Sequence, residues 1–108
     1  MSIELVFIDQ SVRKVCEQGR VADSLLGPQA ARRLRARLAD IRAARTLAEV
    51  VAGSPKFLEA GLRVLFSLHP PYQLVVEPAS NPVPRTKKGE VDWSKIDKVR
   101  VIYVGKPK

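Results

Sequence analysis

The hydrophobic pattern of this chain changes its period once, and that change limits what the chain can fold into. After a short segment at the start, apolar residues recur every three or four positions up to about residue 51, as on the buried side of a helix. From residue 56 the period becomes two, as in a strand that buries one face. Helices followed by strands predict an α+β domain, with N-terminal helices packed on one face of a small antiparallel, mixed-edge sheet. With 108 residues, the chain is sized for one domain, residues 1–108.

The N-terminal half begins with a predicted strand over residues 3–8 and then becomes helical. Asp9 can cap a first helix, because its carboxylate can accept from free N–H groups of the first turn. The apolar positions of that helix are Val12, Val15, Cys16, Ala22 and Leu26. We therefore expect one helix that continues to Gly27.

A second helix is predicted after Gly27, with Pro28 in its first turn, where a missing N–H costs nothing. One stripe at a spacing of three and four predicts its buried side: Ala31, Leu34, Leu38 and Ile41. Thr46 is predicted to cap a short extra turn over residues 47–51, which Gly53 and Pro55 end.

The C-terminal half alternates, and this predicts strands and their faces. Over residues 62–69, one face carries Leu62, Val64, Phe66 and Leu68, and the other carries Arg63, Leu65, Ser67 and His69. Residues 72–77 are expected to pair with that strand in antiparallel fashion, and residues 79–92 form a long exposed loop rich in Pro, Ser, Asn, Gly and Lys. A last strand is predicted over residues 98–104, with one side formed by Val99, Val101 and Tyr103.

The charge balance indicates the kind of partner. The chain has 19 Lys and Arg against 11 Asp and Glu, a formal net charge of +8. Such an excess on a small domain favours a phosphate backbone or an acidic protein. A solvated basic surface without a polyanion remains the alternative interpretation.

Cys16 is the single cysteine, so the sequence offers neither an internal disulfide nor a Cys/His zinc cluster. Its apolar neighbours at helical spacing predict a buried residue rather than a nucleophile. No apolar stretch is long enough for a membrane span, and residues 1–4 lack the charged start of a signal peptide. We expect a cytoplasmic protein without a membrane partner.

Three segments resemble a known family: Val12–Glu17, Pro71–Pro78 and Val91–Ile96. They are similar to the HigB-type (plasmid maintenance killer) toxins of the RelE/ParE superfamily. The resemblance implies a RelE-like fold and an endoribonuclease that cuts mRNA in the ribosomal A site, beside ribosomal RNA, without metal or other cofactor. It also implies a cognate helix-turn-helix antitoxin as partner, with a toxin–antitoxin heterotetramer as one assembly.

The resemblance also implies where catalysis is carried. The family has a His and a Lys before the third strand, an Arg after the Tyr of a PYRL-like run, and a C-terminal Tyr-His pair. The corresponding positions here hold Lys56, Glu59, Gln73 and Pro107-Lys108. Glutamine lacks the fixed charge that arginine offers a phosphate. The candidate catalytic residues are therefore Lys56, Arg63, His69, Gln73, Lys106 and Lys108.

His69 is included because histidine is the commonest proton-transfer residue and alternation places it on the face of Arg63. An idle residue at a strand end is the competing interpretation. The candidate RNA- or ribosome-binding residues are Arg32, Arg35, Arg42, Arg85, Lys87 and Lys88. The helix arginines fit an acidic antitoxin segment equally well, and the loop cations fit a basic loop kept soluble by its charge. Tyr72 and Trp93 are assigned to packing rather than to base stacking.

Two functions of different classes follow. The first is a type II toxin that acts as a ribosome-dependent mRNA endoribonuclease. The second keeps the fold without catalysis: a ParE-like toxin that inhibits gyrase or another target, or a degenerate antitoxin partner. The substituted catalytic positions favour the second function, whereas the charge and the three similar segments favour the first.

Overall fold

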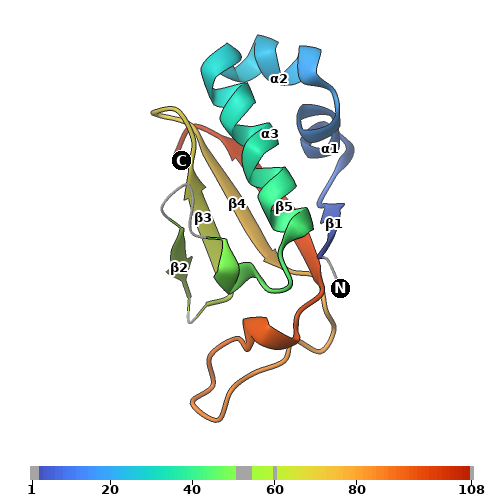
Figure 1. The fold of residues 1–108 in the computed structure, drawn as a ribbon, viewed down its shortest axis with the longest axis vertical. Coiled ribbons are helices and arrows are strands. Elements are labelled where there is room, and N and C mark those ends of the chain that lie inside the picture. The colour runs from blue at the N-terminus through green and yellow to red at the C-terminus, as the bar shows by residue number, and fades with distance from the viewer. Residues whose placement is uncertain (1–2, 51–54, 60, 108) are drawn as a thin grey trace.

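The computed structural model describes residues 3–50, 55–59 and 61–107 and confirms the predicted α+β class. In the described part of the chain, three helices and a five-stranded mixed sheet form one unit (Figure 1). The elements are, in order, β1 (Glu4–Phe7), α1 (Gln10–Glu17), α2 (Gly19–Leu26), α3 (Pro28–Ala43), the 3-10 turn η1 (Leu47–Glu49), β2 (Lys56–Leu58), β3 (Arg63–Ser67), β4 (Gln73–Pro78), the 3-10 turn η2 (Trp93–Lys95) and β5 (Lys98–Gly105).

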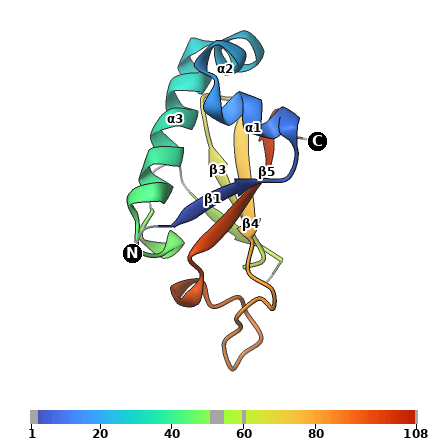
Figure 2. The same cartoon turned by 90° about the vertical axis from the view of Figure 1, so that its right-hand side faces the viewer.

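The sheet has the strand order β1-β5-β4-β3-β2. β2, β3, β4 and β5 pair with their neighbours in antiparallel fashion, whereas β1 lies parallel to β5 at one edge. Figure 2 shows β1 alongside β5 at the edge that faces the viewer. The predicted antiparallel sheet with a mixed edge is thereby confirmed. β2 was not predicted, because its three residues are too few to establish an alternating pattern.

The predicted first helix is two helices. Asp9 caps α1 as expected, since its Oδ1 accepts from the N–H of Val12 at 2.8 Å. α1 ends at Glu17, because Gln18 has extended backbone angles of φ −111° and ψ 105°. Gly19 then begins α2. Glycine has a low helix propensity, about 1 kcal/mol worse than alanine, so a break beside it costs little.

α3 confirms the predicted second helix and its stripe. Ala31, Leu34, Leu38 and Ile41 are all buried, and α3 runs across one face of the sheet (Figure 1). Their partners in the core come from β3, β4 and β5, and include Phe66, Leu74 and Val99. After α3, Thr46 precedes η1 without a side-chain capping bond. Residue 51, the last of the predicted turn, and Gly53, which was expected to end it together with Pro55, lie outside the described residues.

The faces of the predicted strands are mostly confirmed. Val64, Phe66 and Leu68 are buried on the helix side. The antiparallel register joins Leu65 to Val75 on the other side of the sheet. β3 ends at Ser67, so the alternation predicted for residues 62–69 does not extend to His69.

Tyr103 lies on the side opposite to the predicted one. Val76 pairs with Val101, but Val75 pairs with Tyr103, so β5 contains one extra residue at this point. Such a bulge moves every later side chain to the other face. Val99 and Val101 are therefore buried under the helices, as predicted, whereas Tyr103 shares the face of Val75.

The segment of residues 79–92 contains no strand or helix, as predicted, but its outer part has a defined turn. The N–H of Thr86 donates to Glu90 O at 2.8 Å, and the N–H of Gly89 donates to Thr86 O at 3.0 Å. Trp93 then returns the chain to the core, where it is 7% exposed, as its assignment to packing predicts. Among the described helices, none is long and apolar enough to cross a membrane.

Candidate active site

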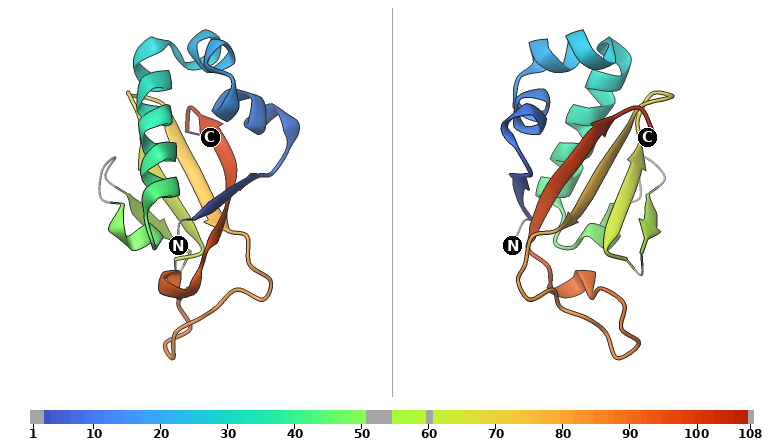
Figure 3. Two further views of the ribbon diagram at one scale, coloured as in Figure 1. Left: turned by 45° about the vertical axis from the view of Figure 1, so that its right-hand side comes forward. Right: turned by 180° about the vertical axis from the view of Figure 1, so that it is seen from behind.

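One face of the sheet carries the helices, and the opposite face, termed here the open face, does not. The right-hand view of Figure 3 shows β5, β4, β3 and β2 from this side, with α3 behind them. By strand register, the open face presents Lys56, Leu58, Arg63, Leu65, Ser67, Gln73, Val75, Glu77, Arg100 and Tyr103. It is the only surface to which several strands contribute polar side chains in the described part of the chain.

A hollow of about 540 Å³ lies in the open face. It is lined by Ile8, Leu58, Glu59, Arg63, Gln73, Val75, Ile102 and Tyr103. The lining therefore combines apolar side chains with four polar groups: the carboxylate of Glu59, the guanidinium of Arg63, the amide of Gln73 and the phenol of Tyr103. This is the mixture expected of a ligand site: mostly apolar lining with a few convergent polar groups.

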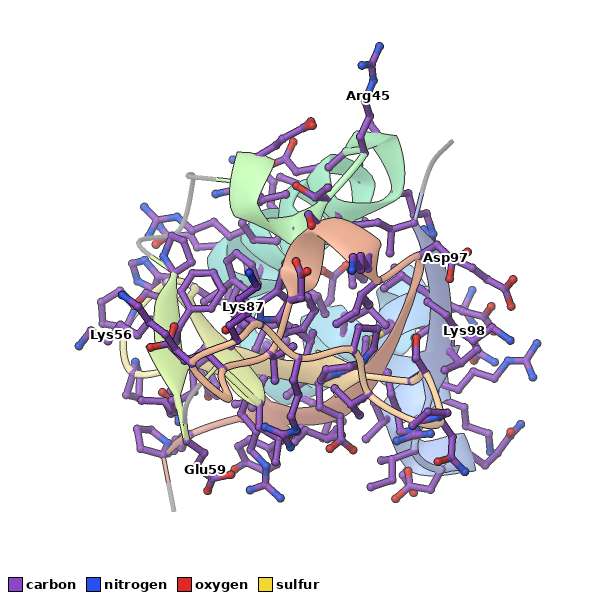
Figure 4. The ribbon with its side chains drawn as sticks, turned by 90° about the horizontal axis from the view of Figure 1, so that it is seen from below. Arg45, Lys56, Glu59, Lys87, Asp97 and Lys98 are labelled. Atoms are coloured by element: carbon purple, nitrogen blue, oxygen red, sulfur yellow. The ribbon has the colours of Figure 1, made fainter. Side chains whose placement is uncertain are left out.

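Glu59 and Arg63 form an ion pair at the margin of the hollow, with 3.6 Å between Arg63 Nε and Glu59 Oε2. Glu59 lies in the β2–β3 turn with φ +53°, a left-handed conformation that few non-glycine residues adopt. The turn is held by the N–H of Gly61, which donates to Leu58 O at 3.0 Å. Figure 4 shows Glu59 on the side of the sheet away from Arg45 and the end of α3. Left-handed residues of this kind are concentrated at functional sites.

Tyr103 reaches the hollow because of the bulge in β5. Its hydroxyl donates a hydrogen bond to the carbonyl of Lys106. Gly105 allows this arrangement, since a Cβ at Gly105 would lie 2.9 Å from Tyr103 Oη. The end of β5 therefore holds the phenol in place: Lys106 accepts its hydrogen bond, and Gly105 leaves room for the ring.

The cations of the open face are largely paired. Besides Arg63, Arg100 Nη1 lies 3.1 Å from Glu77 Oε1. Next to these residues, at the edge formed by β5 and β1, Lys98 Nζ lies 4.0 Å from Glu4 Oε2. Lys56 has no carboxylate within 4.0 Å among the described residues. The Arg63–Glu59 and Lys98–Glu4 pairs are exposed, whereas Arg100–Glu77 is partly buried. Exposed pairs are weak, about 0–1 kcal/mol, so an incoming phosphate can compete for their cations. The face is accordingly nearly neutral in the free protein.

The structure brings together part of the predicted catalytic set. Arg63 and Gln73 both line the hollow, and Lys56 is exposed on the same face, opposite Leu65. His69 does not line it: His69 lies beyond β3 in a turn that is closed by the N–H of Tyr72 donating to His69 O at 3.0 Å. Lys106 is exposed and reaches the site through its backbone carbonyl, whereas Lys108 lies outside the described residues.

Glu59 and Tyr103 belong to the site although the sequence did not predict them there. Glu59 was noted only at a position where the similar toxins have lysine, and its four-residue distance from Arg63 was the available signal. No sequence signal places Tyr103 here, because the bulge in β5 that reverses its face is set by pairing with β4.

Three of the arginines predicted to bind RNA, Arg32, Arg35 and Arg42, lie on α3, away from the open face. Arg32 is exposed without an ion pair to any described carboxylate, whereas Arg35 Nη1 lies 3.8 Å from Asp23 Oδ1. Arg42 is exposed, and a shallow hollow that Glu17 also lines lies beside it. The helical side therefore keeps a positive surface of its own, separate from the hollow.

The three loop cations surround the turn at residues 86–89. Arg85 Nη1 donates to Gly89 O at 3.0 Å, so this side chain helps to close the turn. Lys87 and Lys88 are exposed at the end of the loop, and Figure 4 marks Lys87 in the view along the long axis. The turn therefore presents two lysines on a hydrogen-bonded support.

Cys16 is unsuited to nucleophilic chemistry. Burial raises the pKa of its thiol from 9.0 to about 12, although the nearby Arg42 opposes that shift. The thiolate, which is the reactive form, is therefore rare at neutral pH. Among the described residues, no group of three or more His, Cys, Asp and Glu side chains could hold a metal ion.

Comparisons of the chain with protein-family models, with curated proteins and with solved structures find no match. The class that the fold defines is thus an α+β domain with one polar hollow on the open face of its sheet. The similarity to the HigB-type toxins rests on the three sequence segments alone.

Proposed function

We propose that this chain is the toxin of a type II toxin–antitoxin system, a RelE-like endoribonuclease that cuts mRNA in the ribosomal A site. Its partners would be the message, ribosomal RNA and a helix-turn-helix antitoxin, with a heterotetramer as one assembly in the cytoplasm. The observation that carries the proposal is the convergence of Glu59, Arg63, Gln73 and Tyr103 on one hollow of the open face.

The hollow contains the groups that RNA cleavage without a metal requires. A ribose 2′-hydroxyl attacks the adjacent phosphorus, and the bond from phosphorus to the 5′-oxygen of the next nucleotide breaks. The products are a 2′,3′-cyclic phosphate and a 5′-hydroxyl. The reaction needs a base for the 2′ proton, a cation for the crowded phosphate and an acid for the leaving oxygen.

We assign the base to Glu59, because its carboxylate lies at the hollow and can accept one proton. Arg63, 3.6 Å from Glu59, stabilises the additional negative charge of the phosphate. Tyr103 protonates the leaving oxygen. To do so, its hydroxyl gives up the hydrogen bond to Lys106 O and donates to the leaving oxygen of the substrate instead. Gln73 and Lys56 bind the RNA strand beside the reacting phosphate.

The second candidate function is a toxin or antitoxin partner that binds without cutting, as the ParE-like alternative has it. Three observations favour it. Gln73 is neutral, the charge of Arg63 is partly offset by Glu59, and His69 is not among the residues that line the hollow. In that case the open face would bind gyrase or another target protein through the same hollow.

The experiment that separates the two functions uses the purified chain, translating ribosomes and an end-labelled message. Cuts within codons that disappear in Glu59→Gln would support the ribonuclease, because this change removes the base and keeps the size of the side chain. Intact RNA together with a loss of supercoiling by gyrase would support the binding toxin instead.

A further inference from the structure

β1 stands at one end of the sheet and has a free edge (Figure 2). Among the described strands it pairs with β5 alone, to which it lies parallel. The N–H of Glu4 donates to Asp97 O at 2.8 Å, and the N–H of Ile8 donates to Val101 O at 3.0 Å, so these groups point toward β5. Hydrogen-bonding groups alternate in direction along a strand. The N–H and C=O groups of residues 5 and 7 therefore point to the free edge.

The free edge is apolar and able to form further hydrogen bonds. Residues 5–8 read Leu-Val-Phe-Ile. In the described part of the chain, the outward backbone groups of Leu5 and Phe7 have no hydrogen-bond partner. Edge strands usually resist association by a charge, a proline or a bulge, and this run has none of them, although β1 is short. An edge of this kind can accept a further strand.

A second hollow of about 500 Å³, termed here the edge hollow, lies between this edge, α1 and α3. It is lined by Leu5, Val6, Phe7, Asp9, Gln10, Arg13, Glu17 and Arg42. Two carboxylates and two guanidiniums thus border it in equal number. Arg13 Nε lies 2.7 Å from Glu17 Oε1, so one pair of charges is already matched. With no net charge, the edge hollow attracts neither a polyanion nor a polycation.

The edge and its charges are complementary to a second copy of themselves. A two-fold axis at Val6 sets two β1 strands antiparallel, with Leu5 of each copy opposite Phe7 of the other. These two residues carry the outward backbone groups, so each opposed pair closes two hydrogen bonds, N–H to C=O in both directions. The edge hollow leaves room beside the joined strands, and its balanced charges add no net repulsion there. A two-fold contact requires such a self-complementary surface.

We propose that β1 pairs with β1 of a second copy of this chain and joins the two five-stranded sheets in a two-fold dimer. This pairing goes beyond the proposed ribonuclease function and does not depend on it. Directly opposed residues of antiparallel strands share a face, so both open faces lie on the same side of the joined sheet. Ile8, which lines the hollow of the open face, lies at this joint. The dimer therefore places its two hollows on one continuous surface.

The association is tested with the full parent chain by sedimentation velocity over a range of protein concentrations. Salt is kept near physiological ionic strength, because two chains of net charge +8 repel each other and that repulsion is screened beyond about 8 Å. An edge-to-edge contact is small, so we expect reversible association, with an average mass that rises from one chain toward two. The mass of one chain at every concentration, up to those used for NMR, would overturn the proposal.

Amide hydrogen exchange, followed by NMR, identifies the surface. The N–H groups of Leu5 and Phe7 should exchange about tenfold more slowly in concentrated than in dilute protein, because pairing with a second copy covers them. The N–H of Ile8 is bonded within the chain and should exchange nearly alike in both samples. Association without slower exchange at Leu5 and Phe7 would show a dimer through another surface, and the proposal would be wrong.

A charge placed at the axis tests the register. Val6 lies half-buried on the open face and faces itself across the axis. Val6→Lys sets two like charges opposite each other and should weaken the dimer about tenfold or more. Ser24→Lys is the matched control, since it adds the same charge at an exposed position of α2 and should leave association unchanged.

Mixing the two charge variants of Val6 separates lost pairing from lost folding. Equal amounts of Val6→Lys and Val6→Glu set opposite charges across the axis, so the mixture should associate again. Circular dichroism verifies that each variant is folded, and the exchange experiment on the parent chain decides the question if one is not. A folded Val6→Lys protein that associates like the parent, or a mixture of folded variants that stays dissociated, would contradict the pairing of β1 with β1.

Discussion

Trp93 Nε1 donates a 2.8 Å hydrogen bond to the carbonyl of Gly61, across 32 residues of sequence. Gly61 belongs to the turn that carries Glu59 and leads into Arg63, whereas Trp93 ends the long segment after β4. The ring of Trp93 also meets that of Phe57 edge to face, with 6.3 Å between ring centroids. The tryptophan thus holds the β2–β3 turn against the body of the protein.

Replacing Trp93 by Phe keeps an aromatic ring but leaves the carbonyl of Gly61 without this donor. We expect a loss of about 1–3 kcal/mol in the free energy of unfolding, measured by urea denaturation. Cleavage should fall as well, because the turn that presents Glu59 is less firmly held. Ser94→Ala, at the exposed neighbour, is the control. An unchanged urea midpoint in Trp93→Phe would show that the hydrogen bond contributes nothing.

The two faces of β3 should respond in opposite ways to a charge. Val64 is 0% exposed, so Val64→Asp buries a carboxylate without a partner and should cost several kcal/mol, enough to unfold a domain of ordinary stability. Leu65→Asp, one residue later on the open face, should remain folded. Circular dichroism and thermal melting distinguish these outcomes. A folded Val64→Asp protein would contradict the assignment of the faces.

Arg63→Ala should abolish growth inhibition and lower cleavage about a hundredfold without unfolding the domain, because it removes the cation of the hollow. Arg100→Ala removes another ion-paired arginine of the open face that does not line the hollow, and should have a small effect on cleavage. The two variants are compared for toxicity on induction, at equal expression. If Arg63→Ala remains as toxic as the parent, Arg63 has no part in the site.

Tyr103→Phe should retain RNA binding but lose most cleavage, because it removes the proposed proton donor and keeps the ring. Tyr72→Phe is the control, since Tyr72 is half-buried against the core and is not among the residues that line the hollow. RNA affinity is measured by fluorescence anisotropy and cleavage by gel in the same samples. Equal cleavage by the two variants would assign the leaving-group proton to another donor.

Cys16 predicts a pH dependence of reactivity and of stability. Burial raises the thiol pKa to about 12, so the folded protein should resist alkylation at pH 8 until denaturant is added. The folded state holds the thiol proton more tightly than the unfolded chain. This contribution to stability is therefore present below pH 9 and is lost as the pH rises toward 12. Rapid alkylation of native protein at pH 8 would contradict this burial.

Local patterns were sufficient to predict much of the fold. The stripe of α3 and the alternation of β3 are periodic, and a buried face needs such a period whatever it packs against. The break between α1 and α2 was missed because the apolar spacing continues across Gln18, and only the backbone angles there end the helix. The three residues of β2 gain their strand conformation from pairing with β3.

For the site, the sequence alone determined that cations and a proline-bounded strand occur in the C-terminal half, and that Arg63 and Leu65 share a face. Only the tertiary structure decided that Glu59 and Tyr103 join Arg63 and Gln73 and that His69 does not. The physical reason is that a strand's period is intrinsic to its backbone, whereas turns and bulges depend on which strand lies next to them. The extra residue in β5 appears only in its register with β4, and that register moved Tyr103 into the hollow.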